Sequence, residues 1–235
     1  GQVNRERALI VGEDARHIAL ALRMKAGERL TVCDADGQDY QCVIERISPE
    51  QVELRVEEVA PSAGEPGVWI TLYQALPKGD KMETIVQKAV ELGVGRIVPV
   101  LTHRCVSRPD DKSMRKKCER YNRIALEAAK QCGRGRVPEV APLVGFREAV
   151  AQMRADPLAL FFYENADQPL REVLTGRLGD RVSILIGSEG GFEPSEAAFA
   201  AENGLVPLSL GSRILRCETA PLAAITAILY QAGDI

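Results

Sequence analysis

Two glycine-bearing segments in the last fifty residues each follow a short apolar strand. Residues 187–191 read Gly-Ser-Glu-Gly-Gly after an apolar stretch at 182–186, and residues 211–219 follow a second stretch at 206–210. Ligands in open α/β sheets bind at the carboxyl ends of strands, where glycine lets the backbone approach closely. The segments carry side chains suited to binding or proton transfer, namely Glu189, Arg216 and Glu218. We therefore predict a ligand site built from both segments, although Arg216 paired structurally with Glu218 is an alternative.

Several common chemistries find no support in the sequence. No Gly-x-Gly-x-x-Gly follows a strand and no Gly-x-x-x-x-Gly-Lys-Ser/Thr is present, which argues against a dinucleotide oxidoreductase or a P-loop NTPase. Only His17 and His103 are available as imidazoles, and the six cysteines form no Cys-x-x-Cys pair, so no metal site is predicted. Neither a signal peptide nor a membrane span is apparent, and scattered cysteines are typical of a reduced compartment. We predict a cytoplasmic protein with no membrane partner.

Positive charge is concentrated in one stretch of an otherwise acidic chain. The net charge is −3, yet residues 104–136 hold 11 basic against 4 acidic residues. Such a run is commonly a solvated helix face, but here a surface that binds a polyanion is an equal alternative. Near the start of a predicted helix, Asp80 is suited to cap the helix, and Lys78 and Lys81 are placed to hold a phosphate.

The elements that must position these residues follow two patterns. Residues 1–64 are β-rich, with alternating strands at 29–34, 40–47 and 51–59 after a helical pattern at 15–24. No strand is apparent earlier, which leaves open that a first strand is missing. After a Pro- and Gly-rich linker at 61–67, residues 68–235 alternate strands and helices, which predicts an α/β fold with a mostly parallel sheet. The expected strands there are 68–75, 96–101, 158–163, 182–186 and 206–210, and the expected helices are 80–92, 112–131, 194–201 and 221–232.

Short motifs along nearly the whole chain resemble one family. They are His17-Ile18, Leu22-Arg23-Met24, Lys78-Gly79-Asp80-Lys81-Met82-Glu83, Gln87-Lys88-Ala89, Glu91-Leu92-Gly93-Val94, Gln131-Cys132-Gly133-Arg134, Val137-Pro138-Glu139, Ile186-Gly187-Ser188-Glu189-Gly190-Gly191, Leu210-Gly211 and Ile214-Leu215-Arg216-Cys217-Glu218-Thr219. In this order they resemble the ribosomal RNA small subunit methyltransferase E family of the SPOUT superfamily. Two departures are Ser188, where the family often has proline, and Cys217, where it often has threonine.

The resemblance implies a fold, an activity and partners. It implies a PUA-like β-barrel domain for RNA binding at residues 1–64, and at 68–235 a SPOUT methyltransferase domain with a deep C-terminal trefoil knot. It implies a homodimer that uses S-adenosyl-L-methionine to methylate N3 of one uridine in 16S rRNA, as free RNA or in the small ribosomal subunit. Another SPOUT reaction, on a ribose 2′-oxygen or guanine N1, and a non-catalytic assembly factor that binds rRNA are the alternatives.

The resemblance also implies roles for individual residues. For the chemistry of this reaction, our hypothesis is that Arg216 stabilises the uracil anion and that Glu189 or Glu218 orients the base or accepts its proton. A catalytic Cys217 is disfavoured because N-methylation needs no covalent adduct. The cofactor would contact Tyr163, Glu164, Gly187, Glu189, Gly190, Gly191, Leu208, Leu210, Gly211, Ile214 and Leu215. Together with the basic stretch, it implies RNA contacts by Arg23, Lys78, Lys81, Arg104, Arg115, Lys116, Lys117, Arg134 and Arg136.

Overall fold

A computed structural model describes residues 2–235, which divide into two compact units. The first unit extends to Glu65 and also takes in the short segment Gly133–Arg136. The second unit comprises Pro66–Cys132 and Val137–Ile235. Each unit has its own buried apolar core, so each is described separately.

The first unit is an antiparallel sheet with a short helical segment. Its strand order is β1-β2-β5-β4-β3, and its core includes Ile44, Val52 and Leu54. A PUA-like β-barrel is expected here, and the strand pairs of the described residues run from β1 to β3 without joining these two edge strands. The strands are β1 (Gln2–Val3), β2 (Arg7–Val11), β3 (Arg29–Cys33), β4 (Gln38–Ile47) and β5 (Gln51–Pro61).

The structure revises two expectations for this unit. The early strand is present as β2, which pairs with β5. It is hard to find in the sequence because Ala8–Val11 is continuously apolar and lacks the alternation of a half-exposed strand. The expected helix at 15–24 is shorter: α1 (Glu13–Arg16) passes into a π-helical segment, His17–Ala21. Arg23 then has a φ of 54°, a left-handed conformation that ends the helical path.

The second unit contains a parallel sheet in the order β12-β10-β11-β6-β7-β8, with β9 also beside β7. Every strand pair in this sheet is parallel, which confirms the predicted α/β class with a mostly parallel sheet. Parallel strands place their carboxyl ends at one edge, so the segments after β10, β11 and β12 lie side by side. The strands are β6 (Trp69–Ala75), β7 (Arg96–Leu101), β8 (Glu139–Val140), β9 (Val144–Gly145), β10 (Ala159–Phe162), β11 (Arg181–Ile186) and β12 (Val206–Leu208).

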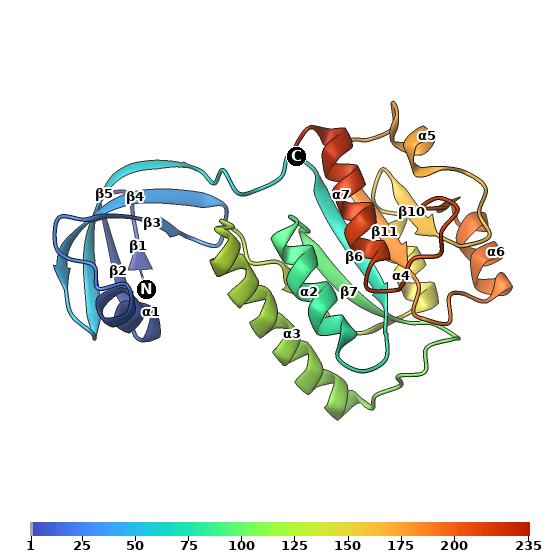
Figure 1. The fold of residues 1–235 in the computed structure, drawn as a ribbon, viewed down its shortest axis with the longest axis horizontal. Coiled ribbons are helices and arrows are strands. Elements are labelled where there is room, and N and C mark those ends of the chain that lie inside the picture. The colour runs from blue at the N-terminus through green and yellow to red at the C-terminus, as the bar shows by residue number, and fades with distance from the viewer. Residues whose placement is uncertain (1) are drawn as a thin grey trace. The chain divides into compact units, whose positions relative to one another are not determined.

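Helices cover both faces of this sheet (Figure 1). One face packs on residues of α2, α3, α5 and α7, and the other on α4 and α6. Alternation along the strands explains the two layers, since Leu160 and Phe162 belong to the first core whereas Phe161 belongs to the second. The helices are α2 (Lys81–Glu91), α3 (Asp111–Cys132), α4 (Phe146–Met153), α5 (Leu170–Leu174), α6 (Pro194–Glu202) and α7 (Ala220–Ala232).

Helix ends agree in part with the sequence signals. α6 begins at Pro194 with a reciprocal capping box between Glu193 and Glu196, and Gly204 follows its end with a φ of 88°. Asp80 does occupy the residue before α2, but its side chain makes no capping hydrogen bond, contrary to expectation. Among the described residues, no helix is both long and apolar enough to cross a membrane.

Candidate functional site

A cavity of about 740 Å³ opens where β10, β11 and β12 end. Its size falls within the range of small-molecule sites. The three segments that follow these strands form most of its wall, as the sheet order requires. Every residue predicted to contact a cofactor lines it: Tyr163, Glu164, Gly187, Glu189, Gly190, Gly191, Leu208, Leu210, Gly211, Ile214 and Leu215. Arg216 and Lys81 line it as well.

The first wall is the turn at residues 187–191. The backbone N–H of Gly191 donates to the Ser188 carbonyl over 3.0 Å, and Gly191 has a φ of 64° that favours glycine. Buried Gln74 of β6 donates from Nε2 to the Gly187 carbonyl over 3.2 Å. From the other side, Arg104 Nη1 donates to the Gly190 carbonyl over 3.1 Å. This wall is therefore fixed by hydrogen bonds from two neighbouring segments.

The second wall, residues 210–216, makes far fewer hydrogen bonds to the rest of the protein than the first wall does. Among the described residues, no protein acceptor takes the backbone N–H of Leu210 or of residues 212–216. The Gly211 N–H donates only to Ser209 Oγ, over 3.3 Å. Leu208, at the base, is fully buried, whereas Ile214 is 89% exposed. The segment thus presents unpaired donors to whatever enters the cavity.

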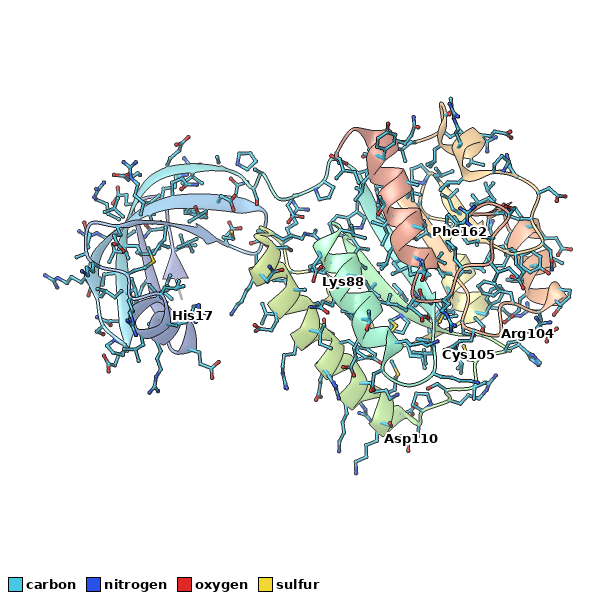
Figure 2. The ribbon with its side chains drawn as sticks, viewed as in Figure 1. His17, Lys88, Arg104, Cys105, Asp110 and Phe162 are labelled. Carbon is cyan, nitrogen blue, oxygen red and sulfur yellow. The ribbon has the colours of Figure 1, made fainter. Side chains whose placement is uncertain are left out.

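The third wall follows β10, whose last residue Phe162 is labelled in Figure 2. Tyr163 donates its backbone N–H to the Leu208 carbonyl over 3.0 Å, which joins this wall to β12. The Glu164 carboxylate approaches Gly191 so closely that a Cβ there would lie 2.7 Å from its Oε1. The chain at 163–164 therefore closes the cavity against both other walls.

A charged cluster joins two of the segments. Lys81 Nζ lies 2.9 Å from Glu189 Oε1 and 3.3 Å from Glu218 Oε2. Burial acts to raise the pKa of Glu189, but hydrogen bonds from Lys81 and from the Lys78 backbone N–H outweigh it, so this pKa is lowered. The pKa of Glu218 is also lowered, by hydrogen bonds from Cys217 and Lys81. Both carboxylates are therefore ionised at neutral pH.

Cys217 lies buried against this cluster, with Sγ 3.1 Å from Glu218 Oε2. Burial, followed by its bond to Glu218, raises the pKa of the Cys217 thiol to about 12. A nucleophilic cysteine must be a thiolate at neutral pH. The environment of Cys217 therefore supports the expectation that it forms no covalent adduct.

The residues expected to contact RNA fall into different settings. Lys78, Arg115 and Lys116 are exposed and Lys117 is half-buried, whereas Lys81 is engaged by the carboxylates described above. Arg104, on the loop after β7 (Figure 2), pairs through Nε with Glu193 Oε1 at 2.9 Å. In the first unit Arg23 and Arg136 are exposed.

Arg134 departs from the expectation of an RNA contact. Its side chain is only 4% exposed, and Nη2 lies 2.7 Å from Glu65 Oε2. A buried guanidinium that is paired with a carboxylate is not presented to a phosphate. We therefore assign Arg134 a structural role within the first unit.

Three site features were missed by the sequence reasoning. Ser188, which departs from the family's proline, lines the cavity, and its Oγ is buried without a partner among the described residues. Asp167 and Phe162 also line the cavity. Ser188 lies within the 187–191 motif, but its type does not reveal a buried, unpartnered hydroxyl; no motif marks Asp167, and the position of Phe162 at a strand end is a weak signal.

The chain matches two family models, one described as an RNA methyltransferase domain, over residues 64–229, and one as an RNA methyltransferase PUA domain, over residues 10–57. It is 35% identical to a ribosomal RNA small subunit methyltransferase E from Bacillus subtilis, over 94% of this chain and 89% of that protein.

Solved structures give the same result. A ribosomal RNA small subunit methyltransferase E from Neisseria gonorrhoeae, bound to S-adenosyl methionine, is 31% identical with a TM-score of 0.84, over 97% of this chain and 93% of that chain. A methyltransferase from Legionella pneumophila in complex with the same cofactor is 33% identical with a TM-score of 0.82, again over 97% and 93%. The similarity thus spans both units and the cavity. The chain belongs to the ribosomal RNA small subunit methyltransferase E family, among the SPOUT methyltransferases.

Proposed function

We propose that this protein uses S-adenosyl-L-methionine to methylate N3 of one uridine in 16S rRNA. The observation that carries the proposal is the cavity formed by three strand-end segments, in a family whose Neisseria gonorrhoeae member binds S-adenosyl methionine. The 2′-oxygen of ribose and N1 of guanine are the rival acceptors within related enzymes. A non-catalytic rRNA-binding assembly factor is the rival outside them.

The residues around the cavity suit this cofactor. Its adenine needs an apolar surface with polar contacts at the ring edge, and apolar Leu208 lines the cavity together with the segment that carries the unpaired N–H groups of Leu210 and residues 212–216. Its ribose and methionine portions are rich in hydrogen-bonding groups, and the orphaned Ser188 Oγ is a buried partner available to them. A Cβ at Gly187, Gly190 or Gly191 would lie 3.1 Å from Phe192, 3.0 Å from Arg104 or 2.7 Å from Glu164, respectively, so glycine lets this turn pack closely on the neighbouring segments that shape the cavity.

In the proposed reaction S-adenosyl-L-methionine supplies an electrophilic methyl group, and the protein must align uracil N3 and ease loss of its proton. Arg216 is exposed and lines the cavity, which supports our assignment of its guanidinium as the donor to a uracil carbonyl oxygen that stabilises the developing anion. Because the pKa values of Glu189 and Glu218 are lowered, these carboxylates are weak proton acceptors. We assign them to orientation, and the proton to solvent.

The remaining parts of the proposal concern the assembly. The exposed basic side chains of α3, including Arg115 and Lys116, are suited to the phosphates of 16S rRNA, free or in the small subunit. Arg23 and Arg136 are the corresponding candidates in the first unit. We also propose that the chain forms a homodimer, and that its C-terminal segments form the deep trefoil knot of the superfamily.

Calorimetry with S-adenosyl-L-methionine, followed by methyl mapping of 16S rRNA, tests the proposal. The rRNA comes from cells that lack their own enzyme of this family, with and without this chain. We expect cofactor binding and one chain-dependent methyl group on uridine N3. A methyl group on a ribose or on guanine would identify a related reaction, and absence of cofactor binding would favour the assembly factor.

A further inference from the structure

Lys81, the first residue of α2, lies where two cavity segments meet. Its ammonium contacts Glu189 of the first wall at 2.9 Å and Glu218, just after the second wall, at 3.3 Å. Cys217 Sγ lies 3.9 Å away. The side chain is 32% exposed, and its partners are 27% and 26% exposed. One cation is therefore shared by two carboxylates from segments that are far apart in sequence.

The backbone next to Lys81 strengthens one side of this link. The Lys78 N–H donates to both carboxylate oxygens of Glu189, over 3.2 and 3.3 Å. The start of α2 thus binds Glu189 through a backbone donor and an ammonium group. By contrast, the described hydrogen bonds of the Glu218 side chain come from Lys81 and the neighbouring Cys217. The ammonium is consequently the side-chain tie between the 187–191 turn and the segment that continues from 210–216.

We propose that Lys81 is a positioning residue that holds the two cavity segments together, not a contact for RNA phosphate. The inference rests on the proposed cofactor site, because in it Lys81 keeps two walls of that site at their observed separation. The charges explain the requirement: without the ammonium, two carboxylates would face each other and repel. The weakly bonded second wall would then lose its tie to the fixed first wall.

The proposed tie has a pH signature. Lowered carboxylate pKa values contribute stability that is present above the ordinary glutamate range, near ~4.3, and lost as pH falls through the lowered values. The facing titratable groups are Lys81, Glu189, Glu218 and Cys217. Cofactor affinity of the natural protein should therefore be flat from about pH 7 to about 5, below the titration of the cofactor's own α-amino group. Without Lys81, one carboxylate takes up a proton at higher pH, so affinity should change within that range.

The test compares Lys81→Met and Lys81→Arg with the control Lys88→Met. Lys88 also lies on α2 (Figure 2) and pairs with a carboxylate, that of Glu91 at 2.8 Å, but does not line the cavity. In Lys81→Met we expect the Kd for S-adenosyl-L-methionine to rise about tenfold or more, with a new pH dependence. Lys81→Arg should restore most of the affinity, and Lys88→Met should bind as the natural protein does.

Amide hydrogen exchange of the cofactor-free protein gives a readout that does not require the proposed function. In Lys81→Met, exchange within 187–191 and 216–219 should accelerate, whereas Lys88→Met should leave it unchanged. Unaltered exchange and unaltered affinity in folded Lys81→Met would overturn the inference while leaving the cofactor site intact. If the natural protein bound no cofactor, the proposed function would fail, and the exchange result would still decide the role of Lys81.

Discussion

Replacement of Gly191 by alanine is the sharpest test of the first wall. Gly191 has a φ of 64°, and its N–H closes the turn onto Ser188. An added Cβ would lie 2.7 Å from Glu164 Oε1 and 3.3 Å from the carboxyl carbon. Glu164 is exposed, so its flexible carboxylate can move away. The main cost is therefore the left-handed backbone conformation, about 1–2 kcal/mol for a residue with a Cβ.

This conformational free energy can lower the stability of the fold or weaken cofactor binding, and each effect can be measured. If the turn keeps its shape, unfolding becomes easier and Tm falls by about 2–8 °C for a chain of this size. If the turn relaxes locally, it must return to the left-handed conformation when the cofactor binds, and Kd rises about 5- to 30-fold. Because Gly190 is exposed and Gly191 is only half-buried, local relaxation is feasible, and we expect the larger part of the effect in Kd.

Gly176→Ala is the matched control. Gly176 has a φ of 79°, an added Cβ would meet no atom within 4 Å, and the residue does not line the cavity. Calorimetric titration with S-adenosyl-L-methionine and thermal melts should show a similar loss of stability or more for Gly176→Ala, with unchanged Kd. The reasoning is refuted if Gly191→Ala binds the cofactor as tightly as the natural protein, since the cavity would then not need this turn.

Three further predictions follow from the same contacts. Arg216→Ala should abolish most methyl transfer in single-turnover assays while calorimetry shows normal cofactor binding; full turnover would exclude the role proposed for this guanidinium. Cys217→Ser should retain methyl transfer, because a thiol whose pKa is raised to about 12 is not a nucleophile at neutral pH; an inactive but folded variant would argue otherwise. Glu65→Gln should destabilise the first unit by about 1.5–3 kcal/mol in urea unfolding, because a neutral amide replaces the carboxylate that accepts from buried Arg134, and a change below about 1 kcal/mol would show that the pair is solvated.

The elements that sequence patterns located well are those with a single dominant signal. The sequence predicts β7 at its observed bounds, and β6, β11 and α7 to within about one residue. These elements are found easily because a strand buried on both faces, or a largely apolar helix, appears as a nearly unbroken run of apolar residues. Helices α4 and α5 were not predicted, since α5 spans only five residues and α4 only eight. Short elements are stabilised mainly by packing, here Phe146 of α4 and Leu170 of α5, and packing is not visible locally.

The residues of the site also fall into a group that the sequence predicts and a group that it does not. Glycines and strand ends identified the cavity walls, because close backbone approach requires specific residue types. The partners of charged residues were not predictable: Lys81 and Arg134 were both expected at RNA, and each is bound to a carboxylate distant in sequence. A charge run records how many cations a segment has but not which of them the tertiary fold neutralises.

The two principal walls of the cavity differ in how firmly the protein holds them, and this bears on how substitutions act. The 187–191 turn is bonded to Gln74, Arg104 and Lys81, so it is largely formed before a ligand arrives. The 210–216 segment has unpaired N–H donors, so a ligand that accepts from them must also order the segment. Changes in the first wall therefore distort a preformed surface, whereas changes in the second alter the free energy of ordering. Lys81 connects the two, because the cation that fixes the first wall also limits how far the second can move.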